Sequence, residues 1–488
     1  MNDHERQLID AIPSDLFIGG EWQTASGGAR FDVVDPSTGE VLCSVADADP
    51  ADGMRALDAA DAAQAAWGRT APRTRSDLLQ RWYGLVHEHA DRLALLMTLE
   101  MGKPLAESHG EIRYGAEFIR WFAEEAVRVN GRYTPVPEGT GTMVVTHRPV
   151  GPCLLVTPWN FPLAMATRKI APALAAGCTV VIKPAALTPL TTLYLVRLLE
   201  QAGLPAGVVT VITTSRSGAV CAPIIADPRL RKLSFTGSTD VGRALLRQAA
   251  DSVLRTSMEL GGNAPFVVFE DADLAAAVEG ALAAKFRNTG QACTAANRFF
   301  VHESIAEEFA QTLAARVRGF AVGRGTEPGV VIGPLIDDAA VAKADSLVQD
   351  ALGRGARLLA GGAAIEGPGS FYQPSVLTGV DPGSRIVAEE IFGPVVSIVP
   401  FASEAEAIAL ANASEYGLAA YVYTQDLQRA RRMIDLIDTG MMGINAGVIS
   451  NAAAPFGGVK QSGLGREGGA EGIHEYLETK YSLIPSEV

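Results

Sequence analysis

The chain has 488 residues, of which 48% are hydrophobic, so it can bury a large core and should divide into two or three domains. Its 41 basic and 55 acidic residues give a formal net charge of -14, which repels nucleic-acid phosphates and anionic membrane surfaces. These values exclude a disordered or fibrous chain and argue against nucleic-acid and membrane partners. An anionic small substrate would need a local cluster of arginines.

The cysteines and histidines predict no metal site. Five widely spaced cysteines form no CxxC pair, which indicates neither a disulfide framework nor a zinc site, and the seven histidines have no ligand spacing. The N-terminus resembles neither a signal peptide nor a transit peptide. The charge-free apolar stretch over residues 170–182 is too short to span a membrane. We therefore expect a cytoplasmic protein.

Taken in chain order, short β-like runs fill the first fifty residues, and an alanine-rich helical region follows to about residue 104. From Pro152 to Ala250, buried-strand runs alternate with helical stretches; the runs are CLLV, CTVVIK, VVTVI and KLSFTG. This alternation indicates a parallel sheet covered by helices on both faces. A second α/β region starts near Ala264 and continues to about residue 460. Residues 129–147 and the tail after residue 471 read as extended arms, or equally as surface hairpins.

Ligands of such sheets lie beyond the carboxyl ends of the strands, which directs attention to TPWN, KPAA and FTGS. The formal G-x-G-x-x-G at residues 463–468 follows PFGGVKQS rather than a strand, so we do not interpret it as a dinucleotide fingerprint. Residues 235–242 stand at a strand-to-helix corner, where backbone amides and the helix dipole favour an anion. An ordinary capped turn is the alternative.

Two residues stand out for chemistry. Cys293 lies in a polar, glycine-containing segment, KFRNTGQACT, whereas the four other cysteines lie in or beside apolar runs and read as packing residues. Glu259 follows a strand-like run and precedes two glycines, so its carboxylate could face a cleft; a surface salt bridge is the alternative.

Seven motifs in this order resemble the aldehyde dehydrogenase superfamily over essentially the whole chain. They are TPWNFP at 157–162, KPA at 183–185, FTGS at 235–238, ELGG at 259–262, GQAC at 290–293, EEIFGPV at 389–395 and PFGG at 455–458. The resemblance implies an α/β fold with three parts. These are a parallel-sheet cofactor domain at 1–128 and 149–261, an α/β catalytic domain at 262–464, and small oligomerisation arms at 129–148 and 465–488 of a homodimer or homotetramer.

The resemblance also implies a mechanism. Cys293 is the expected nucleophile, and the side-chain amide of Asn160 and the backbone N–H of Cys293 hold the oxyanion of the thiohemiacetal. Glu259 is the expected general base for hydrolysis of the thioester. A free thiol with a pKa of about 8.5 is only a few per cent ionised at neutral pH, so the site should lower this pKa or deprotonate the thiol transiently.

The cofactor is expected to be NAD or NADP. The resemblance implies that Glu390 contacts the nicotinamide ribose and that Phe392 lies beside the nicotinamide ring. The other residues that it implies for cofactor contact are Thr157, Trp159, Asn160, Lys183, Gly237, Ser238 and Leu260. NAD-preferring relatives place a glutamate where this chain has Ala186, and losing that acid removes a repulsion against a 2′-phosphate. We therefore expect NADP to be accepted.

Within the superfamily, the chain most resembles succinate-semialdehyde dehydrogenases. Their carboxylate-binding residues map onto Arg168, Arg287 and Ser450, and two guanidinium groups can grip a carboxylate through charge-assisted hydrogen bonds. A structural ion pair is the alternative for either arginine. A second cysteine, which allows a disulfide switch in some members, is replaced by Ala295.

Three alternatives stay open at this point. Glutarate semialdehyde differs from succinate semialdehyde by one methylene, which is worth only ~1–3 kcal/mol of discrimination. Another aldehyde that carries a carboxylate is equally compatible with the two arginines. A binding protein that retains the enzyme fold is the alternative outside the enzyme class.

Overall fold

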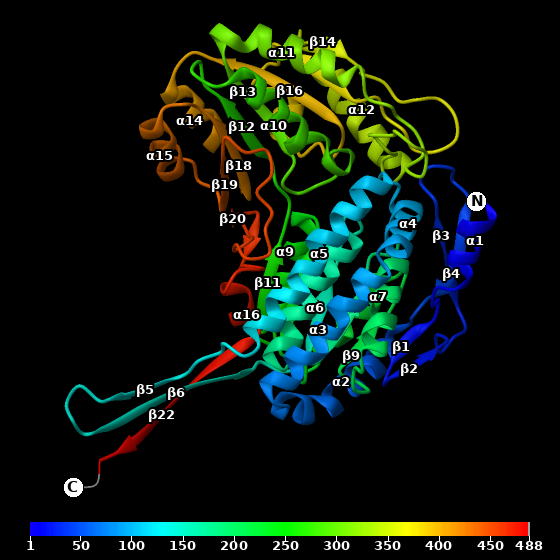
Figure 1. Cartoon of the computed structure of the whole chain (residues 1–488), viewed down its shortest axis with the longest axis vertical. Coiled ribbons are helices and arrows are strands. Elements are labelled where there is room, and N and C mark those ends of the chain that lie inside the picture. The colour runs from blue at the N-terminus through cyan, green and yellow to red at the C-terminus, as the bar shows by residue number, and fades with distance from the viewer. Residues whose placement is uncertain (487–488) are drawn as a thin grey trace.

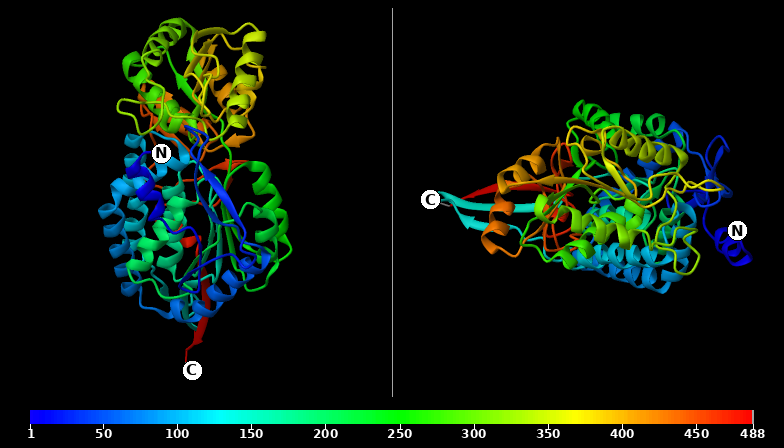
Figure 2. Two further views of the ribbon diagram at one scale, coloured as in Figure 1. Left: turned by 90° about the vertical axis from the view of Figure 1, so that its right-hand side faces the viewer. Right: turned by 90° about the horizontal axis from the view of Figure 1, so that it is seen from above.

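Two lobes and a thin arm make up the molecule (Figure 1). The structure is a computed structural model that describes residues 1–486. Each lobe is built on one mostly parallel sheet with helices on both faces, which confirms the predicted α/β fold class. The lobes are stacked one above the other, and the arm carries the C-terminal end away from both (Figure 2).

The first sheet has eight strands in the order β2-β1-β9-β8-β7-β10-β11-β21. Its five central strands run parallel, whereas β1, β2 and β21 pair antiparallel. The bounds are β1 (Leu16–Ile18), β2 (Glu21–Gln23), β7 (Cys153–Val156), β8 (Val180–Lys183), β9 (Val209–Val211), β10 (Lys232–Thr236), β11 (Arg255–Glu259) and β21 (Gly463–Leu464). The predicted strand runs CLLV, CTVVIK, VVTVI and KLSFTG thus contain β7 to β10.

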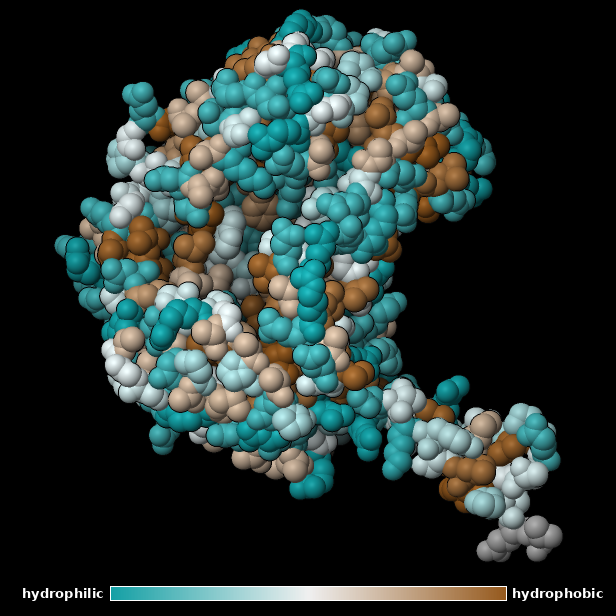
Figure 3. Space-filling view, turned by 180° about the vertical axis from the view of Figure 1, so that it is seen from behind, coloured by the Kyte–Doolittle hydropathy of each residue, from teal (hydrophilic) through white to brown (hydrophobic). Residues whose placement is uncertain are grey.

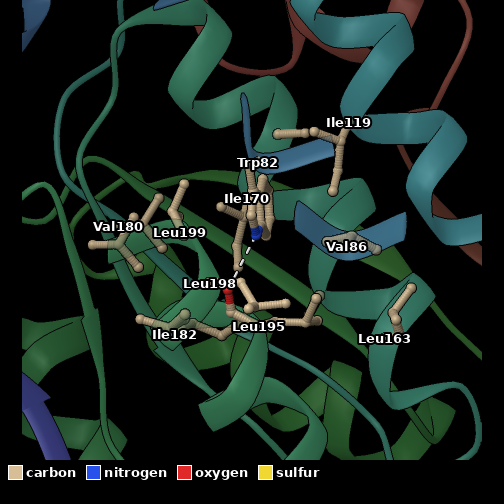
Figure 4. Packing of buried hydrophobic residues seen from close by; sticks show 14 of the residues in the cluster. Trp82, Val86, Ile119, Leu163, Ile170, Val180, Ile182, Leu195, Leu198 and Leu199 are labelled. Carbon is tan, nitrogen blue, oxygen red and sulfur yellow. Dashed lines mark hydrogen bonds between the residues drawn. The ribbon is translucent and has the colours of Figure 1, made fainter. Parts of the chain in front are cut away.

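Helices cover both faces of this sheet because neighbouring residues of each strand point to opposite sides. In β7, Leu155 packs with α3 to α7, and Leu154 packs with α2, α8 and α9. The helices are α2 (Pro50–Arg69), α3 (Pro72–Glu88), α4 (Ala90–Met101), α5 (Leu105–Glu125), α6 (Pro162–Ala176), α7 (Leu190–Gln201), α8 (Ser217–Ala226) and α9 (Thr239–Ala250). Figure 4 shows Trp82 within the first of these layers, where its indole N–H donates to the carbonyl of Leu195 at 3.1 Å.

The second sheet has seven strands in the order β14-β15-β16-β13-β12-β18-β19, all parallel except β14. The strands are β12 (Ala264–Val268), β13 (Ala296–His302), β14 (Arg357–Ala360), β15 (Ser375–Thr378), β16 (Val395–Phe401), β18 (Ala419–Tyr423) and β19 (Met441–Ile444). Two helices cover one face and the others cover the opposite face. They are α10 (Leu274–Phe286) and α11 (Glu303–Val317), then α12 (Asp338–Gly353), α13 (Arg385–Ala388), α14 (Glu404–Asn412) and α15 (Leu427–Leu436).

The arm is a three-stranded antiparallel sheet in which β6 (Gly141–Pro149) lies between β5 (Arg132–Pro135) and β22 (Leu477–Pro485). Hydrophobic residues show on the surface of the arm (Figure 3). Its exposed apolar and aromatic side chains include Tyr133, Tyr481, Leu483 and Ile484. The short remaining elements are α1 (Asp3–Asp10), β3 (Arg30–Val34), β4 (Val41–Ala46), β17 (Tyr416–Gly417), β20 (Val459–Lys460), α16 (Glu471–His474) and the 3-10 turn η1 (Arg287–Gly290). Within residues 1–486, no helix combines the length and apolarity that a bilayer crossing requires.

Candidate active site

A cavity of about 260 Å³ lies where the two lobes meet, beyond the carboxyl ends of β7, β10 and β11. Most of the residues that the sequence assigned to catalysis and cofactor binding line it. The lining residues are Pro158, Trp159, Asn160, Met165, Thr236, Gly237, Ser238, Leu260, Gly261, Cys293, Ala340, Lys343, Glu390, Ile391 and Phe392. Motifs more than 200 residues apart in the sequence therefore share one wall.

Cys293 follows η1, where Asn288, Thr289 and Gly290 have φ values of 55°, 57° and 76°. Three successive left-handed residues turn the chain sharply before the thiol. The Cys293 carbonyl packs against Gly262, where an added Cβ would lie 2.5 Å from the carbonyl oxygen. Position 262, the second glycine of ELGG, must therefore be glycine because the Cys293 backbone leaves no room for a side chain.

Burial dominates the chemistry of the Cys293 thiol. Desolvation raises its pKa to about 12, with Arg168 acting to lower it and Glu259 to raise it. The sequence predicts two routes to an active thiolate, and the first of them, a lowered pKa of the Cys293 thiol, is not found in this chain. Transient deprotonation by a neighbouring base remains as the route to the thiolate.

Asn160 lies on the loop between β7 and α6 and is 5% exposed. Its Nδ2 donates to the carbonyl of Gln291 at 3.0 Å, two residues before Cys293. One of its two amide hydrogens stays available for another acceptor. An anionic oxygen formed beside Cys293 is such an acceptor.

Glu259 is the last residue of β11, held between Thr236 of β10 and Gly463 of β21. Its carboxyl is buried, and Oε2 has no hydrogen-bond partner among residues 1–486. Burial, followed by the negative charge of Glu467, raises its pKa well above the usual range. A carboxyl that holds its proton to higher pH is a stronger base once ionised.

Sequence reasoning missed Glu467. It lies in the glycine-rich segment that we rejected as a dinucleotide fingerprint, and it forms buried ion pairs with Arg168 Nε and Lys169 Nζ. These two cations hold the Glu467 pKa below its usual range. No sequence motif indicates that Glu467 pairs with these cations, because the contact depends on the pairing of β21 with β11, which lies about 200 residues earlier in the chain.

Two of the residues predicted to bind a substrate carboxylate, Arg168 and Arg287, lie close enough to Cys293 for their positive charges to act on its thiol. Arg168 is 1% exposed, and its Nη1 and Nη2 have no hydrogen-bond partner in the described chain, although its Nε is paired with Glu467. Arg287 lies with its guanidinium 5.4 Å from the ring centre of Phe161. Arg168 is therefore both an ion-pair member and a source of two free donors.

A second cavity, of about 590 Å³, opens beside this cluster between α5 and the loop that contains Ser450. Its lining residues are Gly110, Arg113, Tyr114, Glu117, Arg120, Trp121, Glu124, Ser450, Asn451, Ala452 and Ala453. Burial raises the pKa of the Tyr114 hydroxyl, and this effect outweighs the positive charges of Arg168 and Arg287, which act to lower it. Sequence reasoning missed Tyr114, since helix α5 carries no motif.

Several residues of the predicted cofactor region carry buried polar groups that suit a ligand with phosphates and hydroxyls. The Oγ1 atoms of Thr157 and Thr236 are buried without a hydrogen-bond partner among residues 1–486, as expected for groups that await a ligand. Within the described residues, Lys183 at the end of β8 donates only to the neutral Ser217 hydroxyl, at 2.9 Å, and burial lowers its pKa. Ala186 lies three residues further on, half-buried.

At the other end of this region, Glu390 Oε1 accepts the Gly262 N–H at 3.1 Å, and burial raises the pKa of its carboxyl to about 7. Phe392 has a φ of 55° and its ring meets that of Trp159 edge-on, 5.5 Å away. A left-handed aromatic residue is strained, and such strain concentrates at functional sites. Lys343, which the sequence did not single out, also lines the cavity.

Proteins of known family resemble this chain over most of its length. Residues 22–482 match the model of the aldehyde dehydrogenase family. A succinate-semialdehyde dehydrogenase of Paenarthrobacter nicotinovorans is 59% identical over 90% of this chain and 98% of its own length. A glutarate-semialdehyde dehydrogenase of Pseudomonas putida is 49% identical over 98% of this chain and 99% of its own length.

A solved structure of succinate-semialdehyde dehydrogenase from Burkholderia pseudomallei is similar as well. It superimposes with a TM-score of 0.96 at 51% identity, over 97% of this chain and 98% of that one. These matches confirm the family that the seven motifs indicated. The chain belongs to the aldehyde dehydrogenase family and is an enzyme that oxidises aldehydes with a nicotinamide cofactor.

Proposed function

We propose that the chain oxidises succinate semialdehyde to succinate with NADP or NAD, through a thiohemiacetal and a thioester on Cys293. The observation that carries the substrate class is the pair of buried guanidinium nitrogens of Arg168 that have no hydrogen-bond partner among residues 1–486, on a residue whose charge acts on the Cys293 thiol. A buried donor without a partner is costly, and a carboxylate that accepts from both nitrogens removes that cost. Arg287 and Ser450, which like Arg168 lie close to the Tyr114 hydroxyl, add further donors. Glutarate semialdehyde, one methylene longer, is the second candidate.

Each residue has a role in the proposed reaction. The Cys293 thiol first gives its proton to a neighbouring base, and its sulfur then attacks the aldehyde carbon. The carbonyl oxygen becomes an anion that accepts hydrogen bonds from Asn160 Nδ2 and the Cys293 N–H. A bound nicotinamide supplies the acceptor for the hydride that leaves this carbon. Glu259 then takes a proton from water, which attacks the thioester, releases the acid and restores the thiol.

The arginine cluster predicts a substrate-selective defect. Replacing Arg287 by alanine should lower kcat/KM for succinate semialdehyde about 10- to 100-fold, because one charge-assisted contact is lost. Propanal has no carboxylate, so its kcat/KM should change less than about threefold. Steady-state kinetics with both aldehydes and with glutarate semialdehyde measure this.

Arg113→Gln is the matched control, because Arg113 is an exposed cation at the mouth of the second cavity. It should leave the ratio between the two aldehydes unchanged. Equal losses on succinate semialdehyde and propanal in Arg287→Ala would overturn the proposed carboxylate site. A lower KM for glutarate semialdehyde in the unmodified enzyme would favour the second candidate.

We also propose that NADP is used at least as well as NAD. Lys183 is buried and forms no ion pair among residues 1–486, and position 186 carries alanine, so a 2′-phosphate there would meet a cation without a repelling acid from that position. Replacing Ala186 by glutamate should lower kcat/KM for NADP about tenfold or more relative to NAD. Measuring both cofactors at saturating aldehyde tests this, with Ala186→Gln as the uncharged control of equal size. An unchanged NADP-to-NAD ratio in Ala186→Glu would contradict the assignment.

The lobes and the arm receive proposed roles from the same likeness. We assign cofactor binding to the first sheet with its helices, and the catalytic thiol to the second lobe. The exposed apolar side chains of β22 lie on a sheet edge that pairs with no further strand in the described part of the chain, and such an edge favours pairing with another chain. We therefore assign subunit association to the arm, in a homodimer or homotetramer.

A further inference from the structure

The backbone carbonyl of Asn160 is held by two buried side chains. Lys103 Nζ donates to it at 2.8 Å, and Asn288 Nδ2 donates to it at 3.0 Å. Lys103 is 1% exposed and Asn288 is fully buried. Two donors on one buried carbonyl fix the position of the residue that carries it.

Asn288 closes a ring of hydrogen bonds between the two catalytic loops. Its Nδ2 also donates to the Gln291 carbonyl at 2.9 Å, and the same carbonyl accepts from Asn160 Nδ2 at 3.0 Å. Asn288 therefore touches both the backbone of Asn160 and the acceptor of the Asn160 side chain. The ring ties the Asn160 loop to the Cys293 loop at the point where both enter the cavity.

The conformation of Asn288 is adapted to this contact. Asn288 and Thr289 both have left-handed φ values, 55° and 57°, which is costly for residues other than glycine. Asparagine tolerates this region better than most residues. Thr289 shares the strained turn, but its Oγ1 accepts the N–H of Gly333 at 3.2 Å and makes no contact in the ring.

Lys103 anchors the other side of the same carbonyl. Its ammonium is ion-paired with Glu111, whose Oε1 accepts the N–H groups of Leu163 at 2.8 Å and Ala164 at 3.0 Å. These amides belong to the first turn of α6, directly after the Asn160 loop. A buried ion pair contributes little net stability, so a role in fixing this loop better explains its position.

We propose that Asn288 and Lys103 are positioning residues, which hold the Asn160 amide where the oxyanion forms. This inference rests on the oxyanion role proposed above for Asn160. A donor stabilises an oxyanion only within about 2.7–3.1 Å of its position, and a displacement of about 1 Å can cost about 100-fold in rate. Asn288 acts through Asn160 and touches no reacting atom.

A double-mutant cycle tests this coupling in the full-length enzyme. Asn160→Ala should lower kcat about 100- to 1000-fold, and Asn288→Gly about 10- to 100-fold. In the double variant, Asn288→Gly should add less than about threefold to the loss caused by Asn160→Ala, because the positioned group is already absent. Thr289→Gly relaxes the same turn and should cost less than about threefold.

Alkylation of Cys293 by iodoacetamide supplies a readout that a general structural defect would move. This displacement forms no oxyanion, so its rate should stay within about twofold in Asn288→Gly while kcat falls. Lys103→Met should behave in the same way, and Lys103→Arg should recover part of kcat. If Asn288→Gly does not fold, Asn288→Asp replaces it, since aspartate also tolerates left-handed φ.

The outcomes separate the two hypotheses. Unimpaired Asn160→Ala would overturn the oxyanion role itself. An impaired Asn160→Ala combined with an active Asn288→Gly, or with losses that multiply in the double variant, would overturn the positioning role alone. Equal losses of alkylation rate and kcat in Asn288→Gly would also overturn it.

Discussion

Replacing Cys293 by alanine is expected to abolish NAD(P)H formation from every aldehyde, lowering kcat by at least about 10,000-fold. Without the sulfur, no thiohemiacetal forms, and hydride cannot leave from a tetrahedral carbon bound to the enzyme. Absorbance of the reduced cofactor measures the loss. Cofactor binding should persist, because the surface around Thr157 and Lys183 is untouched.

Cys43 is the matched control for this substitution. It is also partly exposed, and burial raises its pKa to about 11, but it lies on β4, away from the cavity. Cys43→Ala should retain full activity. Activity in Cys293→Ala, or its loss in Cys43→Ala, would show that the nucleophile has been misassigned.

Replacing Glu259 by glutamine is expected to stop the enzyme after one turnover. The thioester should form, giving one reduced cofactor per active site, and then persist because no base activates water. Stopped-flow absorbance should show a burst followed by a steady rate about 100- to 10,000-fold below that of the unmodified enzyme. Intact-protein mass spectrometry should detect the acylated chain.

The pH profile provides a second check on Glu259. Because its pKa is raised well above the usual range, the carboxyl stays protonated until higher pH, and only the ionised form is a base. The deacylation rate should therefore rise with pH at values above the usual titration range of a carboxyl in the unmodified enzyme and be flat in Glu259→Gln. Loss of the burst as well would mean that Glu259 also removes the thiol proton. Glu415→Gln, an exposed carboxylate outside the cavity, should leave both phases unchanged.

Much of the fold follows from local sequence. The runs CLLV and CTVVIK are apolar without alternation, which is typical of strands buried on both faces, and they contain β7 and β8. The motifs at strand ends then point to one shared cavity, because carboxyl ends of parallel strands meet at one edge. Motif likeness supplied the expected roles of Cys293, Glu259 and Asn160, which the kinetic tests above address.

What the sequence could not supply depends on long-range packing. The high pKa of Cys293 results from burial by both lobes, which no local pattern encodes. Asn288 appears as one polar residue in KFRN, and its contact with Asn160 needs a left-handed turn that only the three-dimensional structure displays. Glu467 becomes relevant only when β21 pairs with β11.

The pairing of β21 with β11 also determines how the gene can be divided. The first sheet ends in a strand supplied by residues 463–464, and just beyond it Glu467 forms ion pairs with Arg168 and Lys169. A fragment that stopped at Gly262 would retain both cations in its interior without their shared anion, at a cost of several kcal/mol. Chimeras with a relative should therefore exchange residues 463–467 together with the first lobe, and a split enzyme should keep that segment in the same piece as helix α6.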